Sequence, residues 1–198
     1  MRFSAPAADT SGKPMSPLEI AANLLYLVSV WLAAQNRVHT WWTGIIACAL
    51  FATLFYQSQL YADVVLQGFF IVTSLWGWWQ WRGGIQRVEP PIRRVPIRMM
   101  LMLAVFAGGV TYGYGMILHR YTNAYAPFWD SAILALSVLG QFLLMARRVE
   151  SWLCWILVNT IAIPVYASRG LQLTAAVYVL FWFNAWYGGW RWHRQAER

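Results

Sequence analysis

Uncharged polar and aromatic residues stand inside long apolar stretches of this 198-residue sequence, at spacings that would align them on helical faces. Trp155 and Asn159 are four residues apart, as are Tyr178 and Trp182, so each pair would share one face of a helix. Aromatic rings attract flat cations by the cation–π effect, and amides form hydrogen bonds with hydroxyl groups. These residue types predict a central cavity for a small ring-bearing molecule, lined by Gln67, Trp155, Asn159, Tyr178, Trp182 and Asn184. The alternative is that they only form hydrogen bonds between helices.

Residue combinations typical of catalysis are missing from the sequence. It has no phosphate-binding glycine loop, no GxSxG motif and no two histidines at metal-ligand spacing. The acidic residues stand in tails, in loops or in the first turn of a predicted helix, where the helix dipole favours a negative charge. Cys48 and Cys154 both fall inside apolar stretches, which is typical of packing residues. We therefore predict no catalytic residue, no metal site and no cofactor, with a membrane-embedded enzyme as an alternative.

The composition indicates a membrane protein. Hydrophobic residues make up 60% of the chain and charged residues 11%, against about a quarter charged in an average soluble domain. A helix that crosses the hydrocarbon core needs about 20 apolar residues. Long apolar runs without alternating polarity predict helices, because only helices satisfy their own backbone groups in lipid. The sequence thus predicts an all-α membrane protein of seven transmembrane helices, at residues 18–35, 41–57, 62–81, 97–118, 129–146, 152–168 and 172–190.

The basic residues predict the orientation of these helices. Eleven of them fall in the gaps 36–40, 82–98 and 147–151 or in the C-terminal tail, and four fall on the opposite side. Because basic loops stay in the cytoplasm, we expect a multi-pass membrane protein with its N-terminus outside and its C-terminus inside. The net charge of +8 is explained by these loops, so nucleic-acid binding is not predicted.

The chain partly matches itself at an offset of 111 residues. Trp41 falls on Trp152, and the segment 77–81 falls on 188–192. Three helices would end on the side opposite their start, and a fourth helix would return the chain before three more follow. The two three-helix units would then be parallel, with a substrate site between them near the midplane. Chance similarity of tryptophan-rich runs is the alternative. The predicted organisation is a flexible tail at 1–17, a first three-helix unit at 18–81, a linker with the fourth helix at 82–128, a second unit at 129–192 and a tail at 193–198.

The centres of the predicted helices carry no charged residue. Ion-coupled transporters usually keep ionisable groups at membrane depth. The sequence therefore favours passive, facilitated movement of a solute over coupled pumping.

Several segments together resemble one known family. They are LYADVVLQ at 60–67, continued by GWWQW at 77–81, FWDS at 128–131 and ESWLCWILVN at 150–159. Over roughly residues 18–192 the sequence resembles the PnuC nicotinamide riboside transporters. Gln67, Trp152, Trp155 and Asn159 stand at matching motif positions, which adds Trp152 to the predicted site.

The resemblance implies a fold and an activity. The expected fold is a 3+1+3 arrangement of helices like that of SWEET sugar transporters. The expected activity is facilitated diffusion of nicotinamide riboside across a bacterial inner membrane, after which a cytoplasmic kinase traps it by phosphorylation. Related Pnu proteins carry thiamine, riboflavin or nucleosides, so thiamine or another vitamin is an alternative substrate. A homo-oligomer in membrane lipid is also expected, a trimer being one such arrangement. A scaffold protein, that is, a helix bundle that binds no ligand, is a third possible class of function.

Overall fold

The computed structural model describes residues 17–57, 61–83, 91–121, 126–168 and 172–197. Of the predicted N-terminal tail, residues 1–16 lie outside the described ranges, as do 84–90 of the linker. Within these ranges the chain forms seven helices: α1 (Pro17–Ala34), α2 (His39–Gln57), α3 (Tyr61–Trp81), α4 (Ile97–Tyr121), α5 (Pro127–Met145), α6 (Ser151–Ser168) and α7 (Gln172–Ala196).

Several of the helices have the length and hydropathy of membrane spans. In the described part of the chain, α1, α4, α5 and α6 are long and apolar enough to cross a membrane, and α2 carries a shorter apolar stretch, His39–Leu54. Many large apolar side chains are exposed, among them Val105 and Phe106 on α4, which are 77% and 70% accessible. Exposed apolar surface of this extent fits lipid rather than water. The expected all-helical fold with apolar spans is confirmed.

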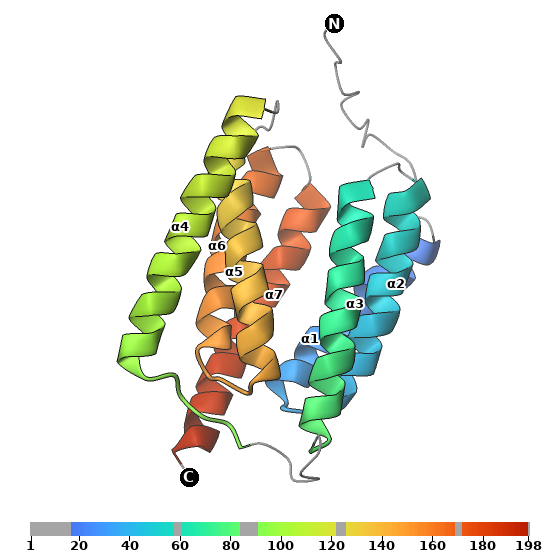
Figure 1. Cartoon of the computed structure of the whole chain (residues 1–198). Helices are drawn as coiled ribbons and strands as arrows, with labels where there is room; N and C mark the ends of the chain where they lie inside the picture. Colours follow the sequence, from blue (N-terminus) through green and yellow to red (C-terminus); the bar gives the residue numbers. More distant parts are fainter. Residues whose placement is uncertain (1–16, 58–60, 84–90, 122–125, 169–171, 198) are drawn as a thin grey trace, which may run out of the picture.

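Six of the helices form a closed ring of contacts. Along the ring, α1 packs against α2, α2 against α3, α3 against α5, α5 against α6, α6 against α7, and α7 against α1. The remaining helix, α4, packs on α5 and lies at the outer edge of the bundle (Figure 1). Side chains that point into the ring therefore share one interior, to which α1–α3 and α5–α7 both contribute.

Equivalent contacts recur in α1–α3 and α5–α7 at an offset of 111 residues. Asn36 and Arg147 have positive φ angles of 55° and 49° in the turns that follow α1 and α5. The next amides close the turns in the same way, with Arg37 N donating to Leu32 O at 2.9 Å and Arg148 N donating to Leu143 O at 2.8 Å. The internal match in the sequence thus corresponds to matching local structure.

Two glycines let tryptophan rings approach a neighbouring helix. A Cβ atom at Gly77 would lie 2.6 Å from the Trp41 ring, and one at Gly188 would lie 2.7 Å from the Trp152 ring. These distances are shorter than a carbon–carbon contact allows, so only glycine fits there. The repeated Trp–Gly contact fixes how α2 packs on α3 and how α6 packs on α7.

We expect Gly188→Ala to lower the free energy of unfolding by about 1–3 kcal/mol, because the added methyl group overpacks the Trp152 contact. The matched control is Gly108→Ala on α4, where a Cβ would meet nothing within 4 Å. Thermal unfolding of the purified variants in detergent measures the difference. Equal melting temperatures for the two variants would show that this packing is loose.

The segment before α4 lies along the turn between α5 and α6. Arg93 N donates to Arg147 O at 3.0 Å, and Val149 N donates to Arg93 O at 3.1 Å. The Glu150 carboxylate accepts a hydrogen bond from Val95 N at 2.8 Å and lies 3.8 Å from the Arg94 guanidinium. The linker therefore fastens α4 to the second group of three helices.

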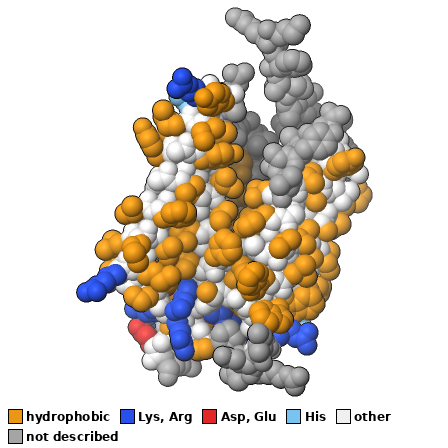
Figure 2. Space-filling model, viewed as in Figure 1, with side chains coloured by type: hydrophobic (Ala, Val, Ile, Leu, Met, Phe, Trp, Pro, Cys, Tyr) orange, Lys and Arg blue, Asp and Glu red, His pale blue; other side chains and the backbone are white. Residues whose placement is uncertain are grey.

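Basic side chains gather at one end of the bundle. In Figure 2 the Lys and Arg side chains of the visible face lie mainly at its lower end, where α7 also ends in Figure 1. Arg37 and Arg148 belong to turns at that end, whereas Arg120 lies in the last turn of α4 at the other end. The helix α7 itself continues through Ala196, beyond the predicted end at 190 and into the segment predicted as a tail. A contact of 3.3 Å between His193 Nδ1 and the Glu197 carboxylate, four residues apart, supports this last turn.

Candidate functional site

A cluster of aromatic side chains joins four consecutive helices of the ring. We call it the tyrosine cluster, and it consists of Tyr26 on α1, Phe51 on α2, Tyr166 on α6, and Tyr178 and Phe181 on α7. The ring centroids lie 5.3 Å apart for Tyr26 and Phe181 and 4.9 Å apart for Tyr166 and Tyr178. All three tyrosines are half-buried. The cluster therefore connects α7 to both of its neighbours in the ring, α1 and α6, and reaches α2 through Phe51.

A second cluster closes the ring interior at the basic end. The tryptophan cluster consists of Trp41, Trp81, Trp152 and Trp192, all buried. Trp81 and Trp192 lie 5.7 Å apart although α3 and α7 are not neighbours in the ring. Trp41 and Trp152 pack edge-on against them at 5.2 and 5.5 Å. The guanidinium of Arg147 covers the Trp81 ring at 4.4 Å, so a large apolar plug with a cationic cap fills this end.

The group α1–α3 meets the group α5–α7 at two interfaces, α3 with α5 and α1 with α7, which we call seams. A side-chain hydrogen bond spans each seam. At the α3–α5 seam, Gln141 Nε2 donates to Thr73 Oγ1 at 3.3 Å. At the α1–α7 seam, Asn184 Nδ2 donates to the Val30 carbonyl at 3.0 Å. Thr73 and Asn184 are related by the offset of 111, as are Val30 and Gln141. The same positions therefore tie the two halves together on both sides.

The predicted residues on α6 are buried or half-buried. Trp152 belongs to the tryptophan cluster, where its ring packs on Gly188. Trp155 is half-buried and packs against that cluster, and Asn159, one turn further along α6, is only 4% exposed. A buried amide is costly unless its donor and acceptor groups find hydrogen-bond partners. Asn159 is therefore a buried amide one turn from a residue that packs on the tryptophan cluster.

The other predicted residues are less close together than expected. Gln67 is half-buried on α3, at the position that matches Tyr178 under the offset. Trp182 lies on the outer side, because its Nε1 donates to the exposed Thr160 Oγ1 at 3.0 Å and its ring packs on the exposed Trp186. The predicted shared face of Tyr178 and Trp182 therefore does not bring both rings into one cluster.

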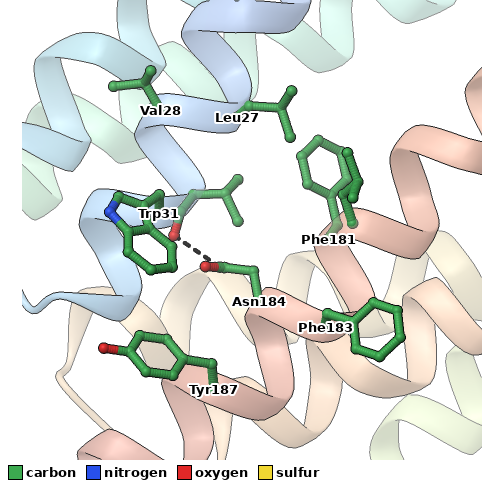
Figure 3. Close-up of a pocket in the computed structure, with 9 residues that line it drawn as sticks. Leu27, Val28, Trp31, Phe181, Phe183, Asn184 and Tyr187 are labelled. Atoms are coloured by element: carbon green, nitrogen blue, oxygen red, sulfur yellow. Dashed lines mark hydrogen bonds between the residues drawn. The ribbon is translucent and has the colours of Figure 1, made fainter.

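Asn184 lines a groove on the outside of the ring, between α1 and α7 (Figure 3). The groove has a volume of about 590 Å³. Its walls include Val28, Trp31 and Phe183, which are 48%, 51% and 60% exposed and belong to outward-facing stripes of their helices. The groove therefore opens to the surroundings of the bundle and is separate from the ring interior.

Sequence reasoning missed two of the three tyrosines. Tyr26 and Tyr166 stand alone within apolar runs and take part in no motif. Their phenol groups were the only signal, since a hydroxyl in an apolar helix requires a partner. The structure also has no group of three His, Cys, Asp or Glu side chains that could hold a metal ion within the described ranges.

Comparison with known proteins assigns the chain to a family. A family model described as nicotinamide mononucleotide transporter matches residues 16–194. The nicotinamide riboside transporter PnuC of Escherichia coli (strain K12) is 26% identical over 94% of this chain and 89% of the relative. The riboflavin/roseoflavin transporter RibM of Streptomyces davaonensis is 22% identical over 82% of this chain and 78% of the relative.

A solved structure has the same fold. The crystal structure of the vitamin B3 transporter PnuC superposes with a TM-score of 0.74 at 23% identity, covering 91% of this chain and 82% of that one. The family match spans nearly the whole chain, and the apolar helices are those of a multi-pass membrane protein. The resemblance seen in the sequence is confirmed, and the chain belongs to the nicotinamide mononucleotide transporter family, with PnuC among its relatives.

Proposed function

We propose that this protein moves nicotinamide riboside, or a closely similar vitamin, across a bacterial inner membrane by facilitated diffusion. The observation that carries the proposal is a closed ring of six helices that includes a tyrosine cluster, a tryptophan cluster and the buried amide of Asn159. A pyridinium ring on ribose offers a flat cation and several hydroxyl groups, which such side chains bind. The names of the nicotinamide riboside and vitamin B3 relatives support the same substrate class.

The positions of the acidic groups support passive movement. Among the described side chains, Glu19 and Asp130 stand in the first turns of α1 and α5, and Glu150 and Glu197 flank α6 and α7. None of these four stands in the middle of a helix, where a coupling ion would need a carboxylate. Net uptake then requires a trap, which a cytoplasmic kinase supplies by phosphorylating the vitamin.

The proposed architecture is seven crossings in two parallel three-helix units, as in SWEET transporters. The contacts that recur at an offset of 111 residues support this arrangement, because each seam pairs a first helix with a third helix. The gathering of arginines at the end where α7 finishes supports a cytoplasmic C-terminus and an external N-terminus. The exposed apolar face of α4 is compatible with assembly into a homo-oligomer such as a trimer.

Uptake into proteoliposomes tests the proposal. With labelled nicotinamide riboside and no ion gradient, the internal concentration should rise to the external concentration and stop there. Enclosing a nicotinamide riboside kinase with ATP should raise total internal label above that level. Accumulation that needs a proton or sodium gradient would contradict facilitated diffusion. Transport of riboflavin or thiamine instead would keep the mechanism and change the substrate, and the similarity to RibM makes riboflavin the first alternative.

We expect Tyr178→Leu to weaken binding of a cationic vitamin by roughly five- to thirtyfold, which corresponds to loss of one desolvated cation–π contact. Leucine keeps most of the volume within the tyrosine cluster but removes the ring face and the hydroxyl. The control is Tyr114→Leu on α4, where the side chain is 41% exposed. Titration calorimetry on purified protein measures both affinities. If the two variants bind alike, the tyrosine cluster takes no part in recognition.

A further inference from the structure

The groove between α1 and α7 has an apolar floor that separates it from the ring interior. Phe181 lines the groove and also contacts Tyr26 and Tyr178 of the tyrosine cluster. Asn184 closes the floor through its bond to the Val30 carbonyl (Figure 3). A molecule in the groove would therefore touch the surrounding membrane on one side and the wall of the ring on the other.

The end of the groove nearest the arginines is polar. Tyr187 stacks face to face on Trp31, with ring centroids 5.3 Å apart and an interplanar angle of 9°. Its hydroxyl accepts hydrogen bonds from Gln35 Nε2 at 3.2 Å and from Arg191 at 3.1 Å. The Nε of Arg191 is buried and has no hydrogen-bond partner.

A second cation extends this polar end. The guanidinium of Arg194 lies 4.3 Å from the centre of the exposed Trp190 ring. The nearby carboxylate of Glu197 is occupied by His193, at 3.3 Å. The end of the groove is thus positively charged, while its length between Leu180 and Tyr187 is apolar and spans roughly 10 Å of helix.

We propose that this groove binds an anionic glycerophospholipid of the membrane, with one acyl chain between α1 and α7 and the phosphate at Arg191 and Arg194. The apolar walls match an acyl chain, and the two guanidinium groups match a phosphate. The flanking Trp31 and Trp190 are the residue type that anchors helices at the level of lipid headgroups. The bound lipid would press on Phe181 and so brace the seam that Asn184 holds.

The test compares phosphatidylglycerol with phosphatidylcholine of the same acyl chains on the purified full-length protein. Lipid retained by the folded protein is counted by native mass spectrometry, and the melting temperature is recorded in the same mixtures. We expect phosphatidylglycerol to be retained and to raise the melting temperature more than phosphatidylcholine. The double variant Arg191→Gln/Arg194→Gln should lose about thirtyfold in phosphatidylglycerol affinity. The control Arg98→Gln removes an exposed arginine at the start of α4 and should change nothing.

Four results would overturn the proposal. Equal retention of the two lipids by the wild type would show that the groove binds acyl chains but does not recognise an anionic headgroup. Unchanged phosphatidylglycerol binding by the double variant would place the lipid elsewhere. A rise in melting temperature with inorganic phosphate alone, equal to that with lipid, would indicate a site for a soluble anion. Cross-linking of two chains through Val28→Cys, with loss of lipid, would make the groove a contact between copies. All four readouts are independent of transport, so they stand apart from the proposed function.

Discussion

The Asn159→Leu variant should bind nicotinamide riboside roughly five- to 150-fold more weakly than the wild type, the loss expected when a buried hydrogen-bonding group loses its partner. Asn159 is buried on α6, one turn beyond Trp155, and its amide both donates and accepts hydrogen bonds. Leucine has similar size but leaves the hydroxyl groups of a bound sugar without a partner. Calorimetry or a ligand-induced shift in melting temperature measures the loss.

The neighbouring position provides a matched control. Thr160 is exposed, and its hydroxyl accepts a hydrogen bond from the outward Trp182. Thr160→Leu places the same side chain on the same helix, but on its outer face, and should leave ligand affinity unchanged. Equal losses for the two variants would mean that α6 is disturbed as a whole. Equal, unchanged affinity would remove Asn159 from the site.

Truncation of Trp192 is expected to have the largest effect on stability. Its side chain is fully buried and contacts both Trp81 and Trp152, so Trp192→Ala leaves a cavity at the point where α3, α6 and α7 meet. Such a substitution costs about 3–5 kcal/mol. The control is Trp186→Ala on the same helix, where the ring is 53% exposed. Thermal unfolding in detergent should show a large drop for the first variant and a small one for the second.

The tryptophan cluster also has a functional consequence in this account. Trp81 and Trp192 meet across the ring, so passage along the proposed path would require that these two rings separate. Trp192→Phe keeps an apolar ring but makes the plug smaller. It should fold and should change the rate of uptake more than the affinity for the vitamin.

For the stability prediction above, a similar melting temperature for Trp192→Ala and Trp186→Ala would contradict the central packing role of the cluster.

Much of the fold follows from the sequence alone. Apolar runs locate each helix found in the described ranges, because length and hydropathy are local properties. The ends are less certain, and α7 continues to Ala196 because the contacts of His193 and Arg194 extend the helix beyond its apolar part. The match of Trp41 with Trp152 is visible in the sequence. The structure gives its physical reason, because each ring packs on a glycine of the following helix.

The site is harder to predict, because helical spacing says which residues share a face but not what that face meets. Residues four apart diverge by roughly 40° around a helix, which is enough to place Tyr178 in the tyrosine cluster and Trp182 on the outside. Asn184 is likewise tied to Val30 at the seam, a contact that depends on how α7 leans on α1. Tyr26 and Tyr166 join the tyrosine cluster only because α1 and α6 both pack against α7, where they contact Phe181 and Tyr178.

A structure of the protein in complex with the vitamin that most raises its melting temperature would test the central claim most directly. The account predicts a ligand enclosed by α1–α3 and α5–α7, between the tyrosine cluster and the tryptophan cluster, with its sugar bonded to Asn159. A ligand found in the outer groove beside Val28 and Phe183, or at the surface of α4, would contradict it.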